Sequence, residues 1–256
     1  MGRPSGYYRK NGDRVPSVTT INGFKRCDAL IGWARKETKR AALEYIQKCV
    51  DADEEISLDR MALYIDEEGA YKVSKEACDI GTVCHQIIDD VIQGRDTEFD
   101  KIDPDILEQS KQPFANWQKW QEQNPVSLIG SEIPLVSEKY RYGGTMDVVT
   151  FADNIMIGDW KSSKAIYDDY WAQLAAYRML YAEHNPNLDV SWDGFIVRFD
   201  KKREQFDHSV VNLQDAWLEF LHFRAVYESR KSTVDRDFLS MFTPQCELKH
   251  LHQFDT

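Results

Sequence analysis

The segment 143–161 constrains the fold more strongly than any other part of this chain. Two runs rich in β-branched residues flank the polar sequence Ala-Asp-Asn at 152–154, a pattern that predicts a β-hairpin. With those three residues as the turn, Asp147 on the first strand faces Asp159 on the second. Residues directly opposite one another on antiparallel strands have Cβ atoms roughly 4.5–5.5 Å apart. Two carboxylates at that separation repel each other, so we expect a divalent cation to lie between them.

Strand alternation adds a positive charge at the same point, because Lys161 shares a face with Asp159. Two carboxylates and one ammonium suit the hydrolysis of a phosphodiester. The peptide carbonyl of Trp160 is a further candidate metal ligand, and Lys161 is a candidate to orient or deprotonate the attacking water. The competing interpretation is a solvent-exposed hairpin whose charges have no function. The register also predicts two neighbouring pairs: Val149 with Ile157, and Phe151 with Ile155.

Length and composition are those of an ordinary soluble protein: 256 residues suffice for one large domain or for a domain with a small lobe. We expect no transmembrane helix, because the chain lacks an apolar run of about 18 residues. The N-terminal sequence lacks the apolar region of a signal peptide. Its five cysteines are scattered without a C-x-x-C pair, which favours reduced thiols in a cytoplasmic protein.

Charge is distributed unevenly along the chain. The overall net charge is −11, yet residues 1–50 carry a net +7, which leaves −18 for the remainder. Such asymmetry favours an N-terminal arm that meets a polyanion. A basic helix that is merely solvated would give the same numbers.

Hydrophobic periodicity predicts helices separated by strands, which is an α/β plan around a mixed sheet. In the helix ending at Gly94 the apolar stripe is Ile80, Val83, Cys84, Ile87, Ile88 and Val91, and Phe114, Trp117 and Trp120 are expected core residues. Asn212 is the expected N-cap of the last helix. The predicted helices are 28–50, 74–93, 105–123, 168–184 and 212–230, and a second hairpin joins 194–200 to 205–211 with Lys201-Lys202-Arg203 at its tip.

Three further groups of residues are candidates for the site, each with a structural alternative. His85 borders the apolar stripe of its helix, where a histidine is more often a core or boundary residue than a metal ligand. Gln173 and Tyr177 share a helix face and suit contacts with phosphate or bases, unless that helix only packs on the sheet. Ser162 and Ser163 can position a phosphate at the end of a strand, or form an ordinary loop.

Taken together, these motifs resemble the PD-(D/E)XK nuclease superfamily, in particular its RecB-type branch of phage exonucleases and the mitochondrial genome maintenance exonuclease. The matching residues, in chain order, are Gly81 and His85, Glu132, Gly144 and Asp147, Asp159-Trp160-Lys161-Ser162-Ser163, and Gln173 with Tyr177. The resemblance implies a restriction-endonuclease-like core, a central mixed β-sheet flanked by helices, preceded by a mostly helical N-terminal lobe. The implied division is a basic DNA-binding lobe at 1–75, the nuclease core at 76–232 and a C-terminal extension at 233–256.

The resemblance also implies roles for the matched positions. Asp147 and Asp159 would bind Mg²⁺, with Mn²⁺ able to substitute, and His85 would join the metal shell. Lys161 would be catalytic, and Gln173 and Tyr177 would contact DNA. Glu132 matches an often acidic position whose role is either metal-related or structural. Some relatives carry an iron–sulfur cluster with three C-terminal cysteines, but here that region offers only Cys246, so we expect no cluster.

The resulting hypothesis is a Mg²⁺-dependent deoxyribonuclease of phage or bacterial type. It would act as an exonuclease on single-stranded or end-processed DNA during replication, recombination or repair, in the cytoplasm of a bacterium or an infected host. A catalytically inactive DNA-binding or assembly subunit on the same fold is one alternative, and an RNA nuclease is another. Sequence gives neither the polarity of cleavage, nor the number of metal ions, nor the oligomeric state.

Overall fold

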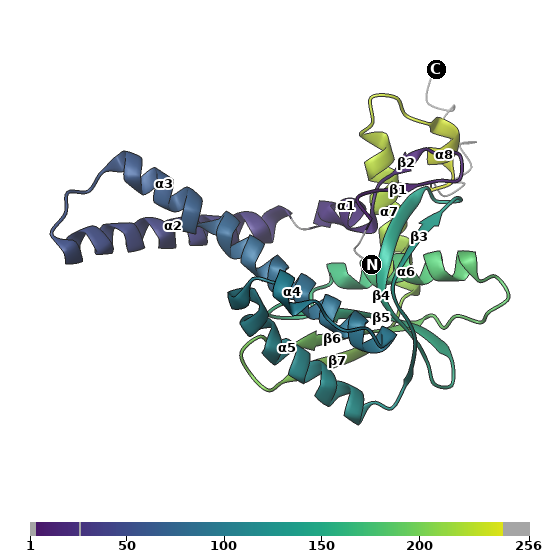
Figure 1. Ribbon diagram of the computed structural model, residues 1–256. Helices are drawn as coiled ribbons and strands as arrows, with labels where there is room; N and C mark the ends of the chain where they lie inside the picture. Colours follow the sequence, from purple (N-terminus) through teal and green to yellow (C-terminus); the bar gives the residue numbers. More distant parts are fainter. Residues whose placement is uncertain (1–3, 26, 243–256) are drawn as a thin grey trace, which may run out of the picture.

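The computed structural model describes residues 4–25 and 27–242. Its centre is a five-stranded mixed sheet in the order β3-β4-β5-β6-β7, in which only β5 and β6 run parallel. The architecture is mixed α/β with helices on both faces of the sheet, as a restriction-endonuclease-like core requires (Figure 1). The strands are β3 (Ser127–Ser137), β4 (Tyr142–Phe151), β5 (Ile155–Lys161), β6 (Asp193–Phe199) and β7 (Phe206–Asn212).

The hairpin predicted from the sequence is the pair β4 and β5. Val149 faces Ile157, and Phe151 faces Ile155, so the register deduced from a three-residue turn is confirmed. The apolar runs pack on both sides of the sheet, which explains why nearly every residue of β4 is buried. The pairing of β4 with β5 ends at Val148 and Gly158, which are the immediate neighbours of Asp147 and Asp159.

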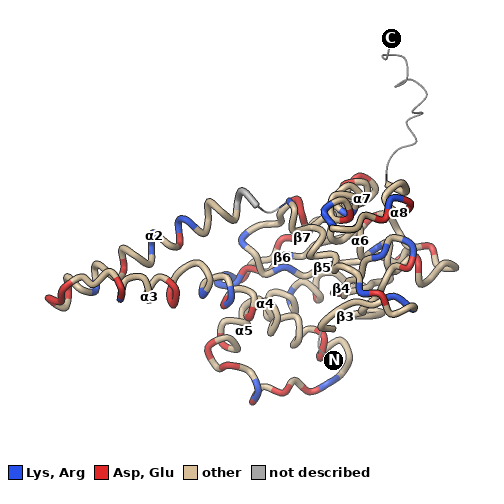
Figure 2. Tube along the Cα trace, turned by 90° about the horizontal axis from the view of Figure 1, so that it is seen from above, with Lys and Arg blue, Asp and Glu red and all other residues tan. Residues whose placement is uncertain are grey.

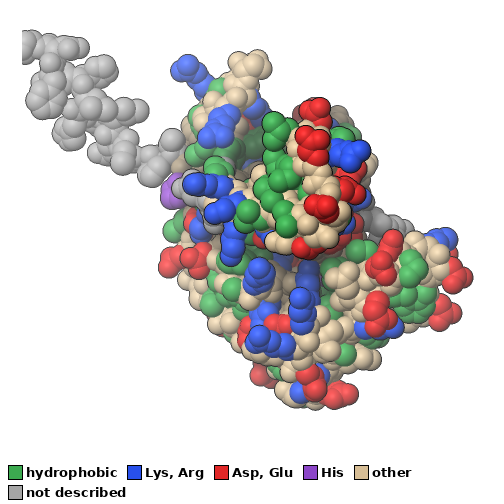
Figure 3. All heavy atoms as spheres, turned by 90° about the vertical axis from the view of Figure 1, so that its left-hand side faces the viewer, with side chains coloured by type: hydrophobic (Ala, Val, Ile, Leu, Met, Phe, Trp, Pro, Cys, Tyr) green, Lys and Arg blue, Asp and Glu red, His purple; other side chains and the backbone are tan. Residues whose placement is uncertain are grey.

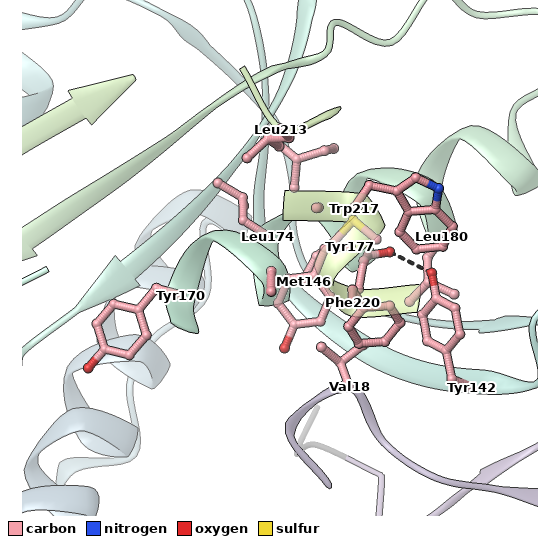
Figure 4. Packing of buried hydrophobic residues seen from close by; sticks show 14 of the residues in the cluster. Val18, Tyr142, Met146, Tyr170, Leu174, Tyr177, Leu180, Leu213, Trp217 and Phe220 are labelled. Carbon is pink, nitrogen blue, oxygen red and sulfur yellow. Dashed lines mark hydrogen bonds between the residues drawn. The ribbon is translucent and has the colours of Figure 1, made fainter. Parts of the chain in front are cut away.

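Two layers of helices bury the two faces of the sheet. On one side, α6 (Asp169–His184) and α7 (Gln214–Ser229) enclose a large cluster that includes Met146 and Leu174 (Figure 4). On the other side, α4 (Ala70–Gln93) and α5 (Pro104–Gln123) pack on a second cluster around Phe195 and Trp160. To this cluster α4 contributes Cys84 and Ile88, and α5 contributes Trp117 and Trp120. The predicted core positions Trp117 and Trp120 are confirmed, and Phe114 packs at the margin of that cluster.

The N-terminal segment leads into a helical arm. β1 (Tyr7–Tyr8) and β2 (Arg14–Val15) form a short hairpin, followed by α1 (Val18–Asn22) and the 3₁₀ turn Gly23–Lys25, and α1 packs against α6 and α7. The arm consists of α2 (Cys27–Ala52) and α3 (Leu58–Glu68), which project away from the sheet (Figures 1 and 2). α4 packs against both arm helices at its start and continues into the core as one helix.

Three short elements complete the described structure. They are the 3₁₀ turn Phe99–Lys101, the C-terminal helix α8 (Arg236–Ser240) and the parallel bridge between Ser17 and Gly143. α8 packs on α7, where Arg141 joins it through an ion pair with Asp235. Residues 243–256 of the expected C-terminal extension lie outside the described residues, as does Cys246.

Two local predictions are wrong. Val91 is 49% exposed, because it lies on the solvent side of α4 while Ile88 and Ile92 of the same helix pack toward the sheet. Asn212 is the last residue of β7, and Leu213 is the N-cap of α7. The Asn212 side chain still accepts a hydrogen bond from the backbone N–H of Gln214, so it supports the turn before the helix.

The ends of the other elements follow their local chemistry. α4 stops at Gly94, which adopts a left-handed φ of 64° that suits a glycine at this position. α5 begins after Asp103, whose carboxylate caps two backbone N–H groups, and it continues through Pro113 without being divided. None of the helices among the described residues combines the length and the apolar character that crossing a bilayer requires.

Candidate active site

The aspartates of the hairpin lie at the point where β4 and β5 separate. Asp147 lies next to the last paired residue of β4, Val148, and its Oδ2 accepts a hydrogen bond of 3.0 Å from the backbone N–H of Trp160. The side chain of Asp147 therefore occupies the position where strand pairing would otherwise continue. Both aspartates are buried, Asp147 at 3% exposure and Asp159 at 0%. The opposed pair predicted from the sequence thus lies in the interior and not on a solvated turn.

Three side chains from separate elements converge beside this point. His85 comes from α4, Glu132 from β3 and Asp147 from β4, and one potential ligand atom of each lies within 4.8 Å of the others. Nδ1 of His85 is 3.4 Å from Oδ1 of Asp147 and 3.6 Å from Oε1 of Glu132. One imidazole and two carboxylates are a donor set that a divalent cation accepts. A possible metal-binding triad therefore exists in this structure.

Glu132 reaches the cluster through an unusual backbone conformation. Its φ is +45°, in the left-handed region that side chains other than glycine rarely adopt. The conformation follows a β-bulge between Leu128 and Gly130, where β3 shifts its register against β4. Backbone strain of this kind typically costs on the order of 1–3 kcal/mol and persists where surrounding structure or function requires it.

The second nitrogen of His85 fixes the orientation of the ring. Nε2 lies 2.9 Å from the carbonyl oxygen of Trp160, the same carbonyl that the sequence predicted as a ligand. With the ring proton on Nε2, His85 donates to that carbonyl and directs the lone pair of Nδ1 toward the two carboxylates. The structure therefore brings His85, Asp147 and Trp160 together, and adds Glu132 to them.

Asp159 and Lys161 form an ion pair next to this triad, in which Asp159 is fully buried and the Lys161 side chain is 16% exposed. Lys161 Nζ contacts Oδ2 of Asp159. Burial raises the pKa of Asp159 to about 7, with Lys161 opposing that effect and the nearby Asp147 adding to it. Burial disfavours the ammonium of Lys161, but Asp159 and Asp147 outweigh it and raise the pKa of Lys161. A carboxylate held in the interior beside a second one is stabilised by any additional cation.

Lys161 is also held by residues of α6. Its Nζ lies 4.7 Å from the centroid of the Tyr170 ring and 3.4 Å from Oε1 of Gln173. Gln173 in turn donates from Nε2 to the hydroxyl of Tyr177 at 2.8 Å. Tyr177 packs closely against Gly144, where an added Cβ would lie 2.6 Å from the ring. Consecutive contacts therefore link the ammonium of Lys161 to Gln173, and Gln173 to Tyr177, the pair predicted from the sequence.

The loop after β5 is anchored on both sides. Ser163 accepts a hydrogen bond of 3.3 Å at its carbonyl from Arg198, and its hydroxyl donates to the carbonyl of Ala165 at 2.7 Å. The hydroxyl of Ser162 faces Gly81 of α4, since a Cβ at Gly81 would lie 3.2 Å from it. Both hydroxyls thus have neighbours within the protein, while the loop backbone is fixed close to Lys161.

Sequence reasoning missed two of these contributions. Arg198 is 5% exposed on β6 and forms ion pairs with Asp200 and Asp207 while it holds the loop. A charged residue inside the apolar run of β6 was the available signal. The contact between Tyr170 and Lys161 joins residues on different elements, and no local pattern in the sequence indicates it.

The arm carries the basic residues expected to meet a polyanion. Lys36, Lys39 and Arg40 line an open groove of about 500 Å³ on α2. Arg40 is committed within the arm, because it pairs with Glu37 and Glu44 and donates to the carbonyl of Glu68 on α3. Seen along the arm, a row of Lys and Arg side chains crosses the middle of the molecule, with acidic side chains to either side (Figure 3).

Comparison with known proteins gives a likeness of shape only. No family model and no curated protein matches the sequence. Among solved structures, the alkaline exonuclease LHK-Exo from Laribacter hongkongensis is 8% identical in its complex with dAMP, with a TM-score of 0.38 over 65% of this chain and 87% of that one. A candidate exonuclease from Eubacterium rectale is 15% identical, with a TM-score of 0.40 over 71% of this chain and 76% of that one.

Proposed function

We propose that this protein is a divalent-metal-dependent nuclease that hydrolyses phosphodiester bonds in DNA. The observation that carries the proposal is the convergence of His85, Glu132 and Asp147 beside the ion pair of Asp159 and Lys161. Acidic groups gathered in this way destabilise a fold unless cations neutralise them. A bound metal ion and the ammonium of Lys161 would together provide that neutralisation.

The donor set fits Mg²⁺, with Mn²⁺ as a substitute that accepts imidazole nitrogen more readily. Asp147, Asp159 and Nδ1 of His85 would hold the ion, with Glu132 as a further candidate. The carbonyl of Trp160 lies at Nε2, on the other side of the imidazole, and would orient the ring instead of binding the ion. A bound divalent cation supplies Lewis acidity and lowers the pKa of water.

The residues of the chain provide the remaining chemistry. Lys161 directs its ammonium at the phosphate, orients the attacking water and stabilises the negative charge that develops on the non-bridging oxygens. The ion pair with Asp159 and the contact with Tyr170 hold that ammonium in one place. Gln173 and Tyr177 offer amide and phenol groups to the adjoining phosphate or sugar. The anchored backbone of Ser162 and Ser163 positions the strand without reading its sequence.

The proposed substrate is DNA with free or unpaired ends, degraded as an exonuclease degrades it. The net +7 of residues 1–50 supports an approach of the strand along the arm, since the rest of the chain is acidic. In this proposal residues 1–75 bind DNA and residues 76–232 perform the cleavage.

End-labelled single- and double-stranded DNA, and RNA of the same sequence, incubated with Mg²⁺, Mn²⁺ or EDTA, tests the proposal. We expect cleavage of DNA with either metal and none with EDTA. Asp147→Asn keeps an oxygen that can accept from Trp160 but loses a charge, and should reduce the rate by about 10²-fold or more. Asp153→Asn, at the exposed turn of the same hairpin, is the matched control.

Two results would contradict the proposal in different ways. Intact DNA and RNA under every condition, with binding retained, would indicate a catalytically inactive binding subunit. Faster cleavage of RNA than of DNA would indicate an RNA nuclease. Lys161→Met separates the roles within the site, because it should abolish cleavage yet still release heat on Mg²⁺ binding in calorimetry.

A further inference from the structure

Tyr167 is an exposed aromatic residue in the loop that joins β5 to α6. Its side chain is 47% exposed, although the neighbouring Tyr170 is almost fully buried. The two rings meet edge to face, with centroids 5.6 Å apart and an interplanar angle of 82°. An edge-to-face contact engages the edge of one ring, so the Tyr167 side chain keeps accessible aromatic surface.

The loop holds Tyr167 in a defined position. Its carbonyl accepts a hydrogen bond of 3.0 Å from the backbone N–H of Tyr170 at the start of α6. Earlier in the loop, Arg198 holds the carbonyl of Ser163, and the hydroxyl of Ser163 holds that of Ala165. An aromatic side chain on a backbone fixed at both ends loses little entropy when it binds a flat ligand.

Two consecutive contacts connect Tyr167 to the ammonium of Lys161. The centroid of the Tyr170 ring lies 4.7 Å from Nζ of Lys161, and the same ring meets the Tyr167 ring edge to face. In Figure 4, Tyr170 lies at the margin of the hydrophobic cluster with its ring directed away from the other labelled residues. Tyr167 is therefore an exposed ring that a single aromatic side chain separates from the ammonium of Lys161, a span comparable to one nucleotide.

We infer that Tyr167 is a base-stacking residue, whose ring receives the unpaired nucleobase next to the scissile phosphate. The inference rests on the proposed function, because Lys161 marks the phosphate. Stacking accepts every base, since each has a π-face. A base inside a duplex has both faces covered by its neighbours, so this subsite selects unpaired nucleotides without selecting sequence. It specifies the substrate class as single-stranded or frayed DNA.

The experiment compares Tyr167→Ala, Tyr167→Phe and Tyr167→Trp on a single-stranded oligothymidylate, with one abasic nucleotide moved stepwise along it. KM and kcat are measured with Mg²⁺, and the affinity is measured by fluorescence anisotropy in EDTA. Phe151→Ala is the matched control, because Phe151 is also 47% exposed but lies at the turn of the hairpin, at the opposite end of β4 from the site.

Tyr167→Ala should raise KM and the dissociation constant by roughly 5- to 150-fold, the range that loss of one stacked base gives. kcat should change little, and the Phe and Trp variants should behave like the wild type. At one position the abasic nucleotide should weaken wild-type binding by the same factor and leave Tyr167→Ala unaffected. Thermal unfolding should be the same for all variants.

The inference is overturned if Tyr167→Ala binds and cleaves as the wild type does. It is also overturned if the variant is weakened equally on abasic and complete strands, because the ring then contacts backbone or only supports the loop. A wild type that binds DNA but cleaves nothing would refute the proposed function, and the anisotropy data would still decide the role of Tyr167. A wild type that does not bind DNA refutes both.

Discussion

The buried carboxyl of Asp159 makes a prediction about stability that does not depend on cleavage. Asp159 is fully buried, and its pKa is raised from 3.8 to about 7, chiefly by burial and with Lys161 opposing the rise. A group whose pKa is higher in the folded state stabilises the fold while it is protonated. Its contribution is complete below about pH 4 and is lost as the pH rises to about 7.

The replacement Asp159→Asn removes this titration while keeping the shape of the side chain. Each tenfold change in proton affinity corresponds to about 1.4 kcal/mol. The rise from 3.8 to about 7 therefore sets a ceiling of roughly 4 kcal/mol on the change in unfolding free energy between pH 4 and pH 8. Relative to the variant, the wild type should lose stability by up to this amount as the pH rises. For a chain of this size that corresponds to a relative fall in Tm of roughly 8–16 °C.

The assay is chemical denaturation in EDTA at several pH values, with the wild type and the variant side by side. Carboxyls remote from Asp159 titrate alike in both proteins, so their effects cancel in the difference between the two unfolding free energies. That difference reports Asp159 together with the two groups coupled to it, Asp147 and Lys161. Asp153→Asn controls for the loss of one negative charge. Adding Mg²⁺ at pH 8 should stabilise the wild type and have less effect on the variant. A difference that stays constant from pH 4 to pH 8 would refute the reasoning, because Asp159 would then titrate alike in the folded and unfolded chains.

Two other expectations concern the arm and the packing behind the site. Reversing Lys36 and Lys39 to Glu should weaken DNA binding and flatten its salt dependence, because each phosphate contact in single-stranded DNA releases about 0.7 counterions. A salt titration by fluorescence anisotropy checks this. An unchanged slope of the logarithm of the binding constant against the logarithm of the salt concentration would mean that these lysines do not contact DNA. Gly144→Ala should destabilise the fold by about 1–3 kcal/mol and slow cleavage, because the added Cβ would lie 2.6 Å from the Tyr177 ring and displace it from Gln173. Gly32→Ala, where an added Cβ meets nothing within 4 Å, is the control in denaturation, and equal stabilities for the two variants would contradict the packing argument.

Features set by local interactions were predictable from the sequence. The hairpin register followed from a three-residue turn and the alternation of side chains, and it holds for Val149 with Ile157. The end of α4 at Gly94 followed from the ability of glycine to adopt a left-handed conformation. The buried tryptophans of α5 followed from the helical period.

Features set by long-range contacts were not predictable. Glu132 approaches His85 from another element and with a positive φ, neither of which the sequence of β3 indicates. Arg40 resembled a phosphate contact on a basic helix, yet α3 folds back and supplies a carbonyl that it binds. Val91 fitted the apolar period of α4, but which flank of that stripe the sheet covers is a tertiary property.

The continuity of α4 restricts how this protein can be altered. Its first turns pack against the arm, and further along the same helix His85 points at the carboxylates. An α-helix turns by about 100° for each residue, so a single insertion between these two regions would swing the arm around the core by that angle while leaving the imidazole in place. The helix α4 thus fixes both the distance and the angle between the arm and the candidate site, so neither can change length or orientation independently of the other.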